Sequence, residues 1–117
     1  MIRFQQGAKL YLATKPVDFR RAVNGLCAYV ADEFELNPSS GDVFVFYNKA
    51  RNRLKILFYD GSGFVLCYKR LEQGKFYVKL NTELDRYELD SQQFQWLFSG
   101  LDFVRLKTLP RYYEKFA

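Results

Sequence analysis

The residues that decide the fold run from Val43 to Arg70: VFVFYNKARNRLKILFYDGSGFVLCYKR. Within this stretch the side chains follow a two-residue period, which is typical of β-strands, over Val43–Asn48, Arg53–Tyr59 and Phe64–Arg70. The tetrapeptides KARN and DGSG separate these runs, and both are short, polar and turn-forming. The stretch therefore predicts three consecutive antiparallel strands.

The same reasoning extends outward along the chain. The two-residue period continues through Lys75–Leu80, which predicts a fourth strand of the meander, and Lys9–Ala13 alternates as a short strand before it. Apolar residues recur at helical spacing over Asp18–Phe34. A second helix is expected with Ser91 as its cap and Gly100 as its end. We expect an α+β fold: an antiparallel β-meander of four to five strands with two helices packed on its one apolar face.

Length and composition indicate an ordinary globular domain. The 117 residues suit one domain, which we expect over residues 1–103, followed by a basic, aromatic C-terminal tail over 104–117. Cys27 and Cys67 form no CxxC pair, so we expect two free thiols in a reducing compartment. No signal-peptide pattern or bilayer-length apolar run occurs, so we expect a cytoplasmic protein with no membrane partner.

The sequence disfavours most enzyme classes. It contains no His, so a Ser–His or Cys–His nucleophile system is excluded. Gly61 and Gly63 belong to a hairpin turn, where at least one should adopt a positive φ, and not to a phosphate-binding loop. Asp18, Asp60 and Asp102 could in principle hold Mg²⁺, but each has a simpler role at a helix start, a turn or a helix end. We expect no catalytic residue, metal, cofactor or small-molecule substrate.

Charge is distributed unevenly along the chain. The total of 18 Lys and Arg against 13 Asp and Glu gives +5, whereas Val43–Thr82 holds eight basic and two acidic residues, a difference of +6. Alternation predicts that Arg53 and Lys55 share a basic sheet face with Lys75 and Lys79, where cations suit phosphate and tyrosines can stack on bases. The DNA-binding candidates are Arg53, Lys55, Lys75, Lys79, Arg20, Arg21, Lys49, Arg51, Tyr59 and Tyr77. The alternative interpretation is that Lys and Arg simply solvate the exposed face of an antiparallel sheet.

Four segments resemble a known bacterial family, and the resemblance runs in order from about Ala8 to Asp102. The segments are Asp18–Leu26 (DFRRAVNGL), Gly41–Phe46 (GDVFVF), Arg53–Gly61 (RLKILFYDG) and Tyr68–Phe76 (YKRLEQGKF). The family is the small TnpB-type accessory protein, encoded by the second open reading frame, of insertion sequence 66 elements. The resemblance implies a non-enzymatic helper in DNA transposition, acting beside a larger transposase that carries the catalytic acids. We expect it to bind DNA, the transposase or both, and the alternative is a pure protein-interaction module without DNA contact.

Overall fold

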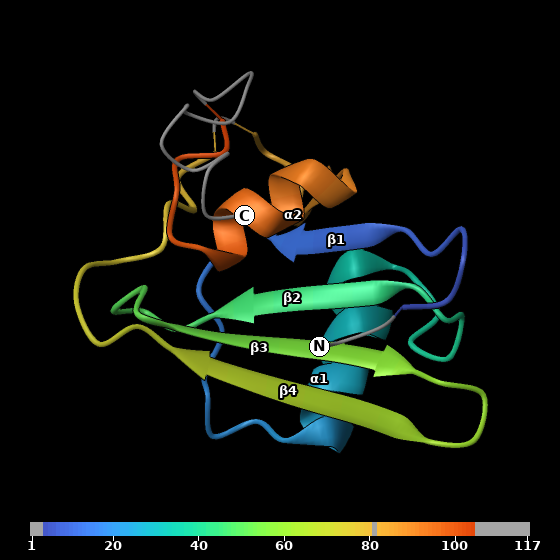
Figure 1. Ribbon diagram of the computed structural model, residues 1–117. Helices are drawn as coiled ribbons and strands as arrows, with labels where there is room; N and C mark the ends of the chain where they lie inside the picture. Colours follow the sequence, from blue (N-terminus) through green and yellow to red (C-terminus); the bar gives the residue numbers. More distant parts are fainter. Residues whose placement is uncertain (1–3, 81, 105–117) are drawn as a thin grey trace.

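The computed structural model describes residues 4–80 and 82–104, which form one open sheet with helices on both sides (Figure 1). The strands are β1 (Leu10–Ala13), β2 (Val43–Tyr47), β3 (Arg53–Tyr59), β4 (Phe64–Arg70) and β5 (Arg86–Leu89), arranged in the order β4-β3-β2-β1-β5. The helices are α1 (Val23–Tyr29), continued by the π-helical turn η1 (Val30–Phe34), and α2 (Ser91–Phe98). The expected α+β fold is confirmed. Apart from Val104, the expected tail lies outside the described residues.

Three of the expected strands form the predicted meander. β2 pairs antiparallel with β3, and β3 pairs antiparallel with β4 over all seven of its residues. β1, however, pairs parallel with β2, because the chain crosses through α1 between them. β5, which the sequence did not predict, lies antiparallel on the other side of β1, so the sheet is mixed.

The prediction of a fourth strand over Lys75–Leu80 is wrong. These residues form no ladder with any strand, although the backbone N–H of Phe76 donates to the carbonyl of Arg51 at 2.6 Å. The alternation itself is correct, since Phe76 and Val78 are buried while Lys75, Tyr77 and Lys79 are exposed. A two-residue period reports that one side of an extended chain is buried, and it does not require a neighbouring strand.

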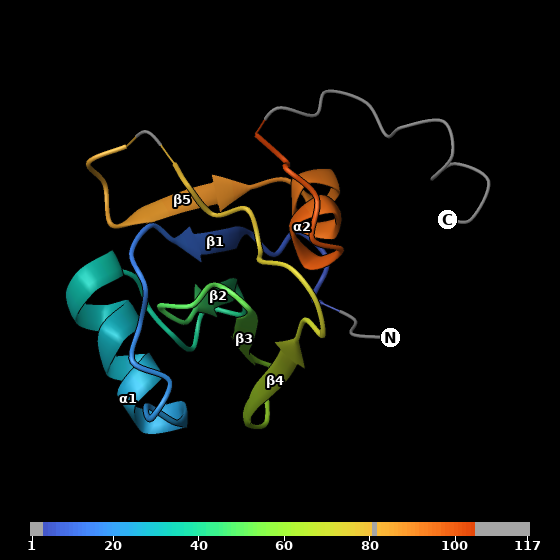
Figure 2. The ribbon, with the colours of Figure 1, turned by 90° about the vertical axis from the view of Figure 1, so that its left-hand side faces the viewer.

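The two helices lie on opposite faces of the sheet, so the expectation that both pack on one apolar face is wrong (Figure 2). On the α1 side, the ring of Phe34 lies 6.2 Å from that of Phe44 and 5.9 Å from that of Phe46. On the α2 side, Phe4 bridges the sheet and the helix, with ring distances of 5.3 Å to Phe58 and 5.6 Å to Phe94. β2 has no polar side chain facing water on either side, so both faces need a covering layer.

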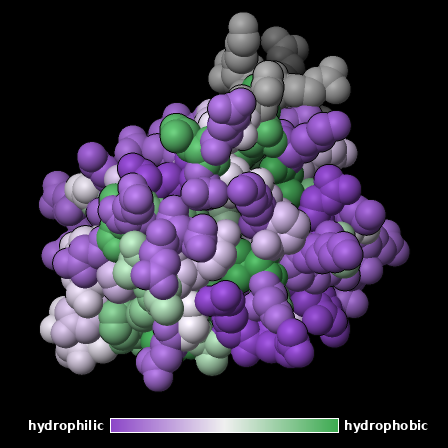
Figure 3. All heavy atoms as spheres, turned by 180° about the vertical axis from the view of Figure 1, so that it is seen from behind, coloured by the Kyte–Doolittle hydropathy of each residue, from purple (hydrophilic) through white to green (hydrophobic). Residues whose placement is uncertain are grey.

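Cover on the α1 face stops short of β4. Phe64 and Tyr68 are 36% and 54% exposed, and their side chains share this face with Lys55 and Tyr59 through the strand register. A view from the α1 side shows apolar side chains gathered at the lower left, where β3 ends and β4 begins (Figure 3).

Among the described helices, none combines the length and the apolar character that spanning a membrane requires.

The first helix begins later than expected. It starts at Val23 instead of Asp18, and its N-cap residue Ala22 makes no side-chain capping bond. The side chain of Asp18 accepts the backbone N–H of Arg20 at 2.9 Å in a local turn, so its expected helix-capping role is wrong. Side-chain bonds to nearby backbone N–H groups compete with helix formation in this way.

The β3–β4 turn has the backbone that its sequence predicts. Gly61 adopts a φ of 99°, which confirms the expected positive φ at this turn, and Gly63 does not share it. The Asp60 carboxylate accepts the N–H groups of Ser62 and Gly63, each at 2.9 Å, and these bonds lower its pKa. The acid is therefore part of the turn.

The two glycines of this turn give a matched test. An added methyl group would meet no atom within 4 Å at either position, so only the backbone conformation differs between them. We expect Gly61→Ala to destabilise the fold by about 1 to 2 kcal/mol, since L-residues are strained at positive φ. Gly63→Ala should be neutral or stabilise by about 0.4 to 1 kcal/mol, because it restricts the unfolded chain. Urea unfolding of both variants checks this, and equal effects would contradict it.

Candidate nucleic-acid interface

The β2–β3 turn positions a pair of cations at one end of the sheet. The Asn48 side chain organises the turn: its Oδ1 accepts the backbone N–H groups of Asn52 and Arg53 at 3.1 and 3.0 Å, and its Nδ2 donates to the Asn52 side chain at 2.8 Å. Arg51 holds a left-handed φ of 61°. Lys49 and Arg51 therefore project from a backbone that is fixed by several hydrogen bonds.

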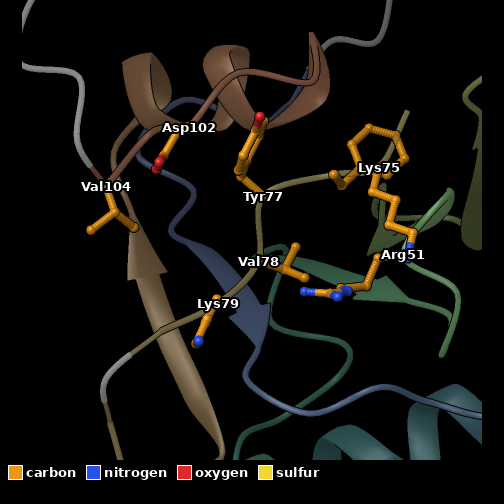
Figure 4. A pocket seen from close by; sticks show the side chains of 8 residues that line it. Arg51, Lys75, Tyr77, Val78, Lys79, Asp102 and Val104 are labelled. Carbon is orange, nitrogen blue, oxygen red and sulfur yellow. The ribbon is translucent and has the colours of Figure 1, made fainter. Parts of the chain in front are cut away.

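The segment of residues 75–80 crosses this turn and completes a hollow of about 500 Å³. Asp102 and Val104 lie on one side of the hollow, Arg51 and Lys75 lie on the other, and the chain through Tyr77 passes between them (Figure 4). An adjoining hollow of about 440 Å³ shares some of these walls and reaches the β1–α1 connection. We call the combined surface the turn-end groove. Its lining includes the cations Lys49, Arg51, Lys75 and Lys79 and the exposed ring of Tyr77.

The groove cations are not neutralised by partners in the part of the chain that the structure describes. Its ion pairs are Lys15–Asp85, Arg20–Asp18 and Arg70–Glu72, and none of them includes a groove cation. The acid that lines the groove is Asp102, on the far wall. Four cations along two adjoining hollows favour an anionic ligand with repeated charges.

The groove lies at the more positively charged of the two ends of the sheet. At its end of the sheet, β1, β2 and β4 finish and β3 and β5 begin. The segments there carry the four acids Asp18, Glu72, Glu83 and Asp85 and a larger number of cations, namely Lys15, Arg20, Arg21, Lys49, Arg51, Arg53, Arg70, Lys75 and Lys79. The connections at the opposite end carry Glu35, Asp42, Asp60 and Asp90, with Lys9 as the cation. We call these the basic end and the acidic end of the sheet.

The structure brings together only part of the predicted site. Lys49, Arg51, Lys75, Tyr77 and Lys79 share the groove, but the single basic sheet face expected from alternation is wrong. Arg53 and Lys55 lie on the face that α1 covers, whereas the segment carrying Lys75 and Lys79 lies on the α2 side. The expectation failed because residues 75–80 do not pair as a strand.

The remaining candidates lie elsewhere. Arg53 is exposed and faces Arg70 across the β3–β4 ladder. Arg20 pairs with Asp18 at 2.6 Å. Arg21 donates to the Gly25 carbonyl at 3.2 Å and its guanidinium lies 5.6 Å from the centre of the Tyr29 ring. Tyr59 lies at the acidic end, with its ring 5.1 Å from that of Phe64.

Three cationic side chains hold parts of the fold together by donating hydrogen bonds to main-chain carbonyl groups. Lys55 donates to the carbonyls of Phe19 and Arg21, both at 2.8 Å, just before α1 begins. Lys69 donates to the Phe98 carbonyl at the end of α2, and burial lowers the pKa of its ammonium. Arg86 donates to the Phe34 carbonyl at 2.6 Å, where η1 ends. Lys55 is thus half-buried and already bonded, although the sequence pattern places it on an exposed face.

The three acids considered for magnesium do not gather. Asp60 lies in the β3–β4 turn at the acidic end, Asp18 is bonded to Arg20, and Asp102 lines the groove. Within residues 4–80 and 82–104, no three His, Cys, Asp or Glu side chains are grouped to hold a metal ion. Thr14 and Pro16 also line the groove, and the sequence carried no signal for them because only the β1–α1 path brings them there.

The fold and the groove define a small α+β domain with one basic end. The chain belongs to the IS66 Orf2-like family, whose TnpB_IS66 model matches residues 8–108. This is an accessory family of IS66 transposition, so the expected family and its link to an insertion sequence are confirmed.

Two relatives from Sinorhizobium fredii (strain NBRC 101917 / NGR234) match most of the chain. The uncharacterized protein y4jC is 40% identical over 110 residues, covering 94% of this chain and 93% of its own. The uncharacterized protein y4hO is 32% identical over 102 residues, covering 87% and 88%. No solved structure matches.

The Asp18–Arg20 pair beside the groove gives a prediction on titration. Hydrogen bonds from Arg20 lower the pKa of Asp18 from 3.8 to about 2. We expect Arg20→Ala to return that pKa towards 3.8, whereas the matched variant Arg21→Ala should change it little. The pair is fully formed above pH 3.8 and is lost as the pH falls through about 2. Carboxyl NMR titration of the three proteins measures this, and equal pKa values in wild type and Arg20→Ala would contradict it.

Proposed function

We propose that this protein is a non-catalytic accessory factor of insertion-sequence transposition that binds the DNA backbone through the turn-end groove. The observation that carries the proposal is the cluster of Lys49, Arg51, Lys75 and Lys79, which forms no ion pair within the described residues and lines the two adjoining hollows of the groove. Cations that are not neutralised internally can release counterions from DNA when they meet phosphates, which is the main source of non-specific affinity.

The proposed binding mode is of low sequence specificity. Lysines are point charges that contact phosphate without reading bases, and Tyr77, 54% exposed at the groove, offers a ring to sugars or an unpaired base. Backbone binding of this kind corresponds to a Kd of about 10⁻⁴ to 10⁻⁶ M at physiological salt. The catalytic acids of transposition then belong to a separate transposase, with which this protein works on the element's DNA in the cytoplasm.

An alternative function uses the same groove without DNA. Tyr77 and Val104 are 54% and 53% exposed there, and exposed aromatic and aliphatic side chains are what a protein interface would use. In that case the domain is a protein-interaction module that docks on the transposase. A pull-down with the cognate transposase, with and without nuclease treatment, separates the two functions because only a DNA-bridged complex is lost on digestion.

Salt dependence tests the DNA proposal. We expect the affinity for duplex DNA to fall steeply with salt. The double variant Lys75→Gln/Lys79→Gln should reduce the slope of log K against log salt by about 0.9 for each phosphate that the protein no longer neutralises. The folded state should be unaffected, since both lysines are exposed and surface substitutions usually change stability by only about 0.5 kcal/mol. Fluorescence titrations at several salt concentrations measure the slope.

Two controls locate the binding surface. Lys9→Gln removes an exposed lysine at the acidic end and should leave the slope unchanged. Arg53→Gln removes an exposed cation on the α1 face and should also leave it unchanged. If wild type binds no DNA at low salt, the DNA function fails and the protein-interaction module takes its place. If only Arg53→Gln alters the slope, the groove is the wrong surface.

A further inference from the structure

β4 forms one edge of the sheet and presents a full row of backbone groups outward. Its inner neighbour is β3, and no described residue pairs on its outer side. The turn bond Asp60–Gly63 and the bond from Leu71 to Asn52 fix which pairs of this ladder are hydrogen-bonded. Because such pairs alternate, the N–H and C=O groups of Phe64, Leu66, Tyr68 and Arg70 point away from β3.

The two edges of the sheet differ in how they are protected. β5 has four residues, and those whose backbone groups point outward are the charged Arg86 and Glu88. β4 has seven residues in unbroken register with no proline, and its outward-pointing residues include the exposed Phe64 and Tyr68. Its lysine, Lys69, turns inward to the Phe98 carbonyl. Free edges usually carry prolines, bulges or outward charges that prevent pairing, and most of β4 lacks these features.

The different charges at the two ends of the sheet favour a second copy of this chain, in antiparallel orientation, as the partner of β4. Two copies that pair through the same edge are related by a two-fold axis, which makes their strands antiparallel. In that arrangement the basic end of each copy, where Arg53, Arg70 and Lys75 outnumber the one acid Glu72, lies beside the acidic end of the other, with Asp60. A parallel arrangement would place the two basic ends together.

We propose that a second copy of this chain pairs with β4, antiparallel, about a two-fold axis at Cys67. Cys67 is the central residue of Phe64–Arg70, so this register lets all seven residues pair. Phe64 of one copy then faces Arg70 of the other, and Leu66 faces Tyr68. The arrangement joins the two sheets into one and places the turn-end grooves at its opposite ends, facing away from each other.

Proline substitution at each edge tests the pairing without DNA, so the outcome is independent of the proposed function. Tyr68→Pro removes an outward N–H from β4 and spares the β3–β4 bonds, and Glu88→Pro removes an outward N–H from the β5 edge in the same way. By sedimentation equilibrium we expect wild type and Glu88→Pro to have twice the mass of Tyr68→Pro. A monomeric wild type or a dimeric Tyr68→Pro variant would overturn the proposal. If wild type is monomeric, a segment of another protein becomes the candidate that pairs with β4.

Cross-linking gives a second measurement that does not depend on how well Tyr68→Pro folds. Across a non-hydrogen-bonded antiparallel pair the Cα atoms lie about 4.5 Å apart, which a disulfide can span. Oxidation of Cys27→Ser with copper phenanthroline, which removes two electrons and two protons from the two thiols, should give a reducible dimer through Cys67. Cys67→Ser, which retains Cys27, should give none. Equal cross-linking of the two variants would contradict the register about Cys67.

Discussion

The rest of the structure depends on the complete burial of β2. Its five residues, Val43–Tyr47, are at most 3% exposed, so its backbone needs a strand on each side and its side chains need cover on both faces. β1 and β3 supply the two ladders. The parallel pairing with β1 requires a crossover, and α1 provides it while covering one face. On the other face, α2 and the buried side chains Phe76 and Val78 complete the cover.

The turn-end groove is a consequence of this cover. Phe76 and Val78 are held against the sheet, so the alternate side chains of the same segment, Lys75, Tyr77 and Lys79, must point outward. The β2–β3 turn adds Lys49 and Arg51 because the segment is anchored on the Arg51 carbonyl. The same packing requirement that closes the core therefore concentrates positive charge at one end of the sheet, which a sum over the chain does not reveal.

The sequence was sufficient for the elements with strong local signals. It predicted the β2–β3–β4 meander, the positive φ in the β3–β4 turn and the second helix, because each depends on a local period or a glycine. The expected cap of that helix, Ser91, is wrong by one residue: the side chain of Asp90 accepts the backbone N–H of Gln93 at 2.7 Å. It failed where pairing with a distant segment determines whether an extended segment becomes a strand. Among the described residues, β5 is a four-residue strand whose only partner is β1, more than 70 residues earlier in the chain. In the same part of the chain, Lys75–Leu80 has the strand pattern without a strand neighbour. Of the predicted site, the five groove residues are brought together, while Tyr59 and Lys55 are separated from them by topology.

The carbonyl bonds of Lys55, Lys69 and Arg86 set these three cations apart from those of the groove. These three bind the carbonyl groups before α1, at the end of α2 and at the end of η1, so the fold constrains them whatever the ligand is. Within the described residues, the groove lysines Lys49, Lys75 and Lys79 make no such bond and no ion pair. A change at one of the carbonyl-bound cations therefore costs free energy of folding, whereas a change at an exposed groove lysine leaves the fold almost unaffected. A count of basic residues overstates the charge that this domain offers to a partner.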